Sequence, residues 1–240
     1  MSRNVFAHGI FLLLLLVAAV SRLAASPPPG GDVRGKISIV KPENSADDAR
    51  RFMMLNRYGL GKSAQADVRV LRQESNNYSL PEKTVIFLEN TTVNAATYPA
   101  PQKHAVLHQR NLMFRPQVLP VLVGATVDFP NDDDLFHNVF SFSRPKDFDL
   151  GRYPRGDSRA VTFDEAGIVR VYCDIHAHMN ATILVLSNPY FAIPDDEGNY
   201  SIPNVPDGKY TLSIWYGRDV VDKKTITVRN GETTFVDLNL

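Results

Sequence analysis

The chain contains a single cysteine, and the residues around it follow the spacing Cys-x-x-His-x-x-Met. Cys173, His176 and Met179 form this triplet, and His137 lies 36 residues upstream of the cysteine, in the run His-Asn-Val. One thiolate, two imidazoles and a weak thioether are the donors that hold copper in electron-transfer sites. The four residues therefore predict a copper site, and such a site requires a fold that brings two distant segments to one point.

Short apolar segments separated by turn residues favour an all-β fold. The first set of predicted strands is 84–88, 111–115, 118–123, 125–129, 138–142, 160–163, 168–173 and 181–186. A second β pattern follows after Leu186 and includes an Asn230-Gly231 pair, which is a strong hairpin signal between alternating strands. The sequence therefore predicts a Greek-key β-sandwich followed by a smaller β-sandwich.

The N-terminal 25 residues are typical of a secretory signal peptide. Arg3 precedes an apolar run over residues 9–20, and small residues follow before Ser26. This run is shorter than the roughly 20 residues that span a bilayer, so we expect no membrane span and a periplasmic or secreted protein. A lone cysteine in an oxidising compartment has no partner for an internal disulfide, which favours metal ligation.

The charge balance gives no sign of a polyanionic partner. Removal of Arg3 and Arg22 with the signal leaves 24 basic against 26 acidic residues. A basic excess would be expected for nucleic acid or an anionic membrane surface, so we expect neither as a partner. No Ser/His/Asp arrangement, phosphate loop or catalytic carboxylate pair is visible either, and we expect the protein not to be an enzyme.

The predicted strands place the four candidate ligands at one end of the first sandwich. Cys173 follows the strand at 168–172, and His176 and Met179 lie on the loop before the strand at 181–186. His137 directly precedes the strand at 138–142. A rigid sandwich would limit ligand movement when the metal changes oxidation state, which keeps the barrier to electron transfer low.

The same residues carry a resemblance to the cupredoxins. The run from Val127 to His137-Asn-Val resembles the first ligand region of that family, and the run from Phe163 to Cys173-Asp-Ile-His176 resembles the second. The loop spacing is similar to that of amicyanin. Two further segments, beginning at 109 and 148, resemble exported bacterial cupredoxins of the methylamine utilisation type.

This resemblance covers roughly residues 84–186 and implies the roles of the candidate ligands. It implies His137, Cys173 and His176 as equatorial ligands and Met179 as the axial ligand of one copper ion that cycles between Cu(I) and Cu(II). It also implies a redox protein as partner, such as a dehydrogenase, cytochrome or oxidase. Asn131 or Asn138 would stabilise the ligand loops through hydrogen bonds.

The C-terminal β pattern is similar to the carboxypeptidase regulatory-like, transthyretin-related domain. This segment lacks the first strands of that domain, which residues 33–40 and 84–88 could supply; alternatively, 84–88 is the first strand of the copper domain itself. The predicted organisation is a signal peptide at 1–25, an N-terminal strand and variable insertion at 26–82, a cupredoxin-like copper domain at 83–187 and the regulatory-like β domain at 188–240.

Other polar residues are given more ordinary interpretations. His178 is expected to face solvent, because a multicopper cluster needs about eight histidines and the chain after the signal has five. The Asp run at 132–134 is interpreted as a solvated turn, and His104 and His108 as local structure. The predicted function is single-electron transfer by a type-1 copper protein; a periplasmic copper carrier or sensor and an adhesion or assembly sandwich are the alternatives.

Overall fold

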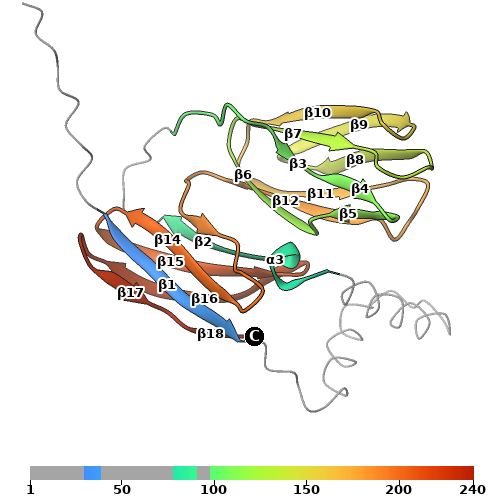
Figure 1. Ribbon diagram of the computed structural model, residues 1–240. Coiled ribbons are helices and arrows are strands. Elements are labelled where there is room, and N and C mark those ends of the chain that lie inside the picture. The colour runs from blue at the N-terminus through green and yellow to red at the C-terminus, as the bar shows by residue number, and fades with distance from the viewer. Residues whose placement is uncertain (1–29, 39–77, 91–97) are drawn as a thin grey trace, which may run out of the picture.

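The structure is a computed structural model, and it describes residues 30–38, 78–90 and 98–240. The predicted signal peptide and most of the predicted insertion at 26–82 lie outside these residues. The described residues form two lobes built from β-sheets, which lie one above the other in Figure 1. Among them, no helix has both the length and the apolar character needed to cross a membrane.

The first lobe is built from ten strands between residues 105 and 186. They are β3 (Ala105–Val106), β4 (His108–Arg110), β5 (Met113–Arg115), β6 (Val118–Leu122), β7 (Ala125–Pro130), β8 (His137–Ser143), β9 (Lys146–Tyr153), β10 (Ser158–Phe163), β11 (Gly167–Tyr172) and β12 (Asn180–Leu186). One sheet has the order β10-β7-β3, a second has the order β6-β12-β11-β8-β9, and β4 pairs with β5 in a hairpin.

The core of this lobe lies between its two larger sheets. Val127 and Phe129 on β7 are completely buried, and the strand alternates buried and partly exposed positions as a half-buried strand should. Val169 and Val171 on β11, in the other sheet, belong to the same apolar cluster. Two sheets that share one core form a sandwich, so the predicted all-β sandwich fold is confirmed.

The second lobe combines strands from both ends of the described chain. They are β1 (Gly31–Ser38), β2 (Thr84–Asn90), β13 (Phe191–Ala192), β14 (Asn199–Val205), β15 (Gly208–Tyr216), β16 (Asp219–Val228), β17 (Thr233–Phe235) and β18 (Leu238–Asn239). One sheet has the order β14-β1-β17, with β18 also paired to β1, and the other has the order β13-β2-β15-β16. A short helix, α3 (Leu80–Lys83), directly precedes β2.

Strand β2 lies in the second lobe, whereas the predicted domain boundary at residue 83 assigned it to the copper domain. It pairs antiparallel with β15 along its whole length, from Thr84 opposite Tyr216 to Asn90 opposite Tyr210. The physical reason is that β2 is apolar on both faces, so it suits a central position in a sheet that is covered on both sides. β1 pairs with β14 in the same lobe, so 31–38 and 84–90 both complete it.

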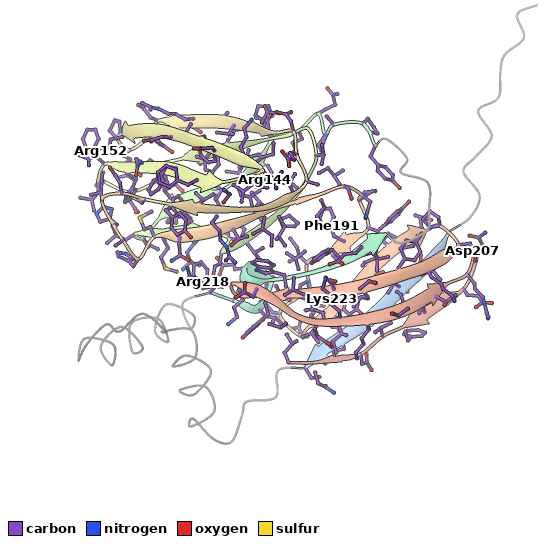
Figure 2. The ribbon with its side chains drawn as sticks, turned by 180° about the vertical axis from the view of Figure 1, so that it is seen from behind. Arg144, Arg152, Phe191, Asp207, Arg218 and Lys223 are labelled. Carbon is purple, nitrogen blue, oxygen red and sulfur yellow. The ribbon has the colours of Figure 1, made fainter. Side chains whose placement is uncertain are left out.

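An apolar cluster joins the two lobes. It contains Val85 and Phe87 of β2 and Trp215 of β15 from the second lobe, together with Val118 and Leu184 from the first. Strand β12 is therefore buried on both faces, since Ile183 and Val185 face the first core. Phe191, labelled in Figure 2, packs against this cluster where the lobes meet.

Candidate metal centre

Three of the four predicted ligands are brought together at one end of the first lobe. Cys173 directly follows β11, His176 lies on the loop between β11 and β12, and His137 is the first residue of β8. β8 and β11 are neighbours in the sheet, with Tyr172 opposite Phe140. The strand order therefore places two loops that are distant in sequence side by side.

The donor atoms of His137, Cys173 and His176 all lie within 4.8 Å of one another. The two Nδ1 atoms of the histidines are 3.1 Å apart, and the Cys173 Sγ is 3.9 Å from the His176 Nδ1. Two imidazole nitrogens that bind one divalent ion at about 2.0 Å are roughly 3.3 Å apart at a tetrahedral angle. The spacing of these donors therefore fits a single metal ion.

The three donors differ in their exposure to solvent. The His137 side chain is fully buried and Cys173 is 4% exposed, whereas His176 is half-buried. Burial lowers the pKa of His176, and the nearby rings of His137 and His178 lower it further. A lowered pKa keeps the imidazole neutral, which is the form that binds a metal.

Met179 is held next to the ligand loop by its backbone. Its N–H donates to the His176 carbonyl at 2.9 Å, and its carbonyl accepts from the Cys173 N–H at 3.3 Å. These two hydrogen bonds close the loop between the three residues. The Met179 side chain is 1% exposed and belongs to the same apolar cluster as Cys173. Its assignment as the axial ligand stays a prediction.

Two buried amides stabilise the ligand loops, as the resemblance implied for one of them. Asn138 Oδ1 accepts from the N–H of Asp174 at 2.7 Å, which joins the residue after His137 to the residue after Cys173. Asn131 Nδ2 donates to the carbonyls of Leu135 and Tyr153. Both amides are almost completely buried: Asn138 joins the two ligand loops, and Asn131 holds the segment before His137 against Tyr153.

One residue of the site, Asp133, was not predicted from the sequence. Its Oδ2 lies 3.0 Å from the Nε2 of His137, and its side chain is only 14% exposed. The interpretation of 132–134 as a solvated turn is therefore wrong for this residue. Asp133 lies four positions before His137 and two positions after Asn131, but this spacing alone does not distinguish it from a solvated turn.

The carboxyl group of Asp133 is held in its charged form. Burial opposes ionisation, but hydrogen bonds from the Leu112 N–H, the His137 ring and the Asn111 N–H outweigh it. Together they hold the pKa of the Asp133 carboxyl below its usual range. A negative charge therefore lies beside the buried ring of His137.

The remaining histidines lie outside the three-donor group. His178 is exposed, as predicted, and its ring centre is 6.2 Å from that of His176. The Nδ1 atoms of His104 and His108 lie 3.0 and 2.9 Å from the carboxylates of Asp128 and Asp132. These two exposed pairs match the predicted role in local structure.

Comparisons with known proteins give partial matches only. Residues 186–236 match the family model of domain II of polysaccharide lyase family 4. That model differs from the carboxypeptidase regulatory-like family, so the resemblance to the latter stays a prediction. No curated protein matches the chain.

Several solved structures of copper proteins overlap with part of the chain. A copper-containing nitrite reductase from Thermus scotoductus SA-01 is 26% identical, with 40% of this chain and 25% of that chain covered and a TM-score of 0.34. A purple cupredoxin from Nitrosopumilus maritimus is 26% identical over 34% of this chain and 99% of that one, with a TM-score of 0.31. A reduced amicyanin variant is 21% identical over 42% and 98%, with a TM-score of 0.34. These TM-scores are low, and only the donor residues themselves indicate a metal centre.

Proposed function

We propose that the first lobe binds one copper ion and carries single electrons between redox proteins outside the cytoplasm. His137, Cys173 and His176 would be the equatorial ligands and Met179 the axial ligand of a type-1 site. The observation that carries this proposal is the meeting of two Nδ1 atoms and one thiol sulfur within 4.8 Å. A set of two imidazoles and one thiolate suits copper in electron-transfer proteins. The signal-like N-terminus supports export, and we propose no catalytic reaction.

The residues around the site would keep the ligands in place during electron transfer. When bound, copper would supply a one-electron couple. Cys173 provides a soft thiolate, and the buried side chains of Cys173 and His137 exclude water from the inner side of the site. The Asn138 bond to the Asp174 N–H joins the two ligand loops and would limit their movement. Small ligand movement is the property that fast electron transfer requires.

The exposed side of the site suits contact with a redox protein. His176 is half-buried, so one part of its ring reaches the surface. The residues directly before the two histidine ligands are apolar and exposed: Phe136 is 58% and Ile175 39% exposed. Arg152, which pairs with Asp174 beside Cys173, lies at the end of the lobe away from the second lobe (Figure 2). A partner such as a dehydrogenase, cytochrome or oxidase would contact this exposed surface.

Copper loading of the purified protein tests this proposal. We expect Cu(II) to produce strong absorption near the red end of the visible spectrum, from charge transfer between the thiolate and the metal. The colour should disappear on addition of a one-electron reductant and return on reoxidation, and the metal should resist a chelator. Rapid loss of copper to the chelator or to an acceptor protein would favour a carrier. Bound copper without the absorption would show that Cys173 is not a ligand.

Substitution of Met179 tests the axial position. Leucine removes the sulfur while it keeps the volume and apolar character of this buried side chain. We expect Met179→Leu to keep the absorption band and to raise the reduction potential, because Cu(II) loses a donor. The rise is about 59 mV for each tenfold loss of Cu(II) affinity relative to Cu(I). Met179→Gln should lower the potential, since an amide oxygen favours Cu(II), and unchanged potentials in both variants would make Met179 a packing residue.

A further inference from the structure

Both ring nitrogens of His137 have partners, although the ring is completely buried. Its Nδ1 lies 3.1 Å from the Nδ1 of His176, on the side of the three donors. Its Nε2 lies 3.0 Å from the carboxylate of Asp133. An ionised carboxylate accepts hydrogen bonds and donates none, so the proton of the neutral ring belongs on Nε2. The lone pair of Nδ1 is then directed towards Cys173 and His176.

Asp133 is itself fixed by an unusual turn. Its two carboxylate oxygens accept from the N–H groups of Asn111 and Leu112, at 2.7 and 2.8 Å. These two residues form the turn between β4 and β5, and both have positive φ angles, 55° and 58°. This conformation is uncommon for a bulky residue such as Leu112 and needs stabilisation from its surroundings. The carboxylate therefore links the hairpin turn to His137.

We propose that Asp133 is a positioning residue of the metal site: it orients His137 with Nδ1 free for the metal and places a negative charge that favours Cu(II) over Cu(I). A carboxylate on the outer nitrogen of a metal-binding histidine fixes the tautomer and raises the basicity of the ligand. The charge stabilises the more positive ion more strongly. The preference for Cu(II) rests on the proposed function, whereas the effect of Asp133 on the His137 tautomer does not.

A purely structural role would produce a different result. If Asp133 only stabilised the turn at 111–112, its removal would reduce stability without any selective effect on the His137 ring. The neighbouring Asp134 offers a matched control, because its side chain is 82% exposed and pairs with Arg155. Asp134→Asn removes the same charge one residue away but leaves the contact with His137 in place.

The decisive experiment measures the His137 tautomer in the metal-free protein by ¹⁵N NMR at a pH where the ring is neutral. We expect the proton on Nε2 in the natural protein and in Asp134→Asn, and loss of this preference in Asp133→Ala, which leaves Nε2 without its side-chain acceptor. An Nδ1 proton in the natural protein would overturn the proposal. So would an unchanged tautomer in a folded Asp133→Ala variant.

The copper-loaded proteins then provide a second readout. We expect Asp133→Asn to lose 10- to 100-fold in Cu(II) affinity, as is typical for such partners of metal ligands. If the affinity for Cu(II) falls tenfold more than the affinity for Cu(I), the reduction potential rises by about 59 mV. Equal shifts of the reduction potential in Asp133→Asn and Asp134→Asn would overturn the proposal that the charge of Asp133 acts on the metal through its position beside His137. The expected tautomer in a protein that shows no copper-thiolate absorption would instead contradict the proposed function.

Discussion

Replacement of Cys173 with serine is expected to abolish the strong red-end absorption of the Cu(II)-loaded protein. A serine hydroxyl stays protonated near neutral pH and is a hard donor, whereas copper in such a site needs a soft thiolate. Cys173 is the only cysteine of the chain, and its Sγ lies 3.9 Å from the Nδ1 of His176. No other thiolate can replace it, so we expect complete loss of the band in a visible spectrum.

His178→Ala is the matched control for this variant. His178 is on the same loop but exposed, and it lies outside the three-donor group. We expect its removal to leave the spectrum nearly unchanged. A band of full intensity in Cys173→Ser would refute the ligand assignment. Loss of the band in His178→Ala would make His178 a ligand of the metal.

Local spacing was enough to predict the three donors but could not identify Asp133. Cys173 and His176 share one loop, and His137 begins a strand whose apolar alternation is visible in the sequence, so the strand order alone brings them together. Asp133 lies in a run of three aspartates that is typical of a solvated turn. Its role depends on the turn at 111–112, and no local pattern shows that this turn packs against the Asp run.

Strands with one apolar face were predicted from the alternation of apolar and polar residues, whereas a largely polar strand was not. β7 alternates buried and partly exposed residues, and the sequence predicted it as a strand. β9 was not predicted, because Lys146, Asp147 and Asp149 make this strand polar, and it lies at the edge of the sheet beside β8. β2 is apolar on both faces, so its pattern predicted a strand without showing which lobe it joins.

The apolar cluster between the lobes contains a residue, Trp215, whose substitution should strongly reduce stability. Trp215 is completely buried, and its Nε1 donates to the Gly217 carbonyl at 2.9 Å. The Arg170 guanidinium, from β11 of the first lobe, lies 5.3 Å above the indole ring. Trp215 also packs in the cluster with Val118 and Leu184 of the first lobe. One side chain of the second lobe therefore supports the sheet that carries Cys173.

We expect Trp215→Ala to lower the free energy of unfolding by about 3–5 kcal/mol, the range typical of a large buried aromatic residue. Far-UV circular dichroism during urea denaturation measures this loss, and the copper-thiolate band reports on the first lobe separately. Phe235→Ala is the control, since Phe235 is 76% exposed and its removal should change stability by less than about 0.5 kcal/mol. Because Trp215 contacts both lobes, the copper band of Trp215→Ala should disappear at a lower urea concentration than in the natural protein. An unchanged midpoint of the copper band beside a lowered midpoint in circular dichroism would mean that the first lobe is stable without the cluster.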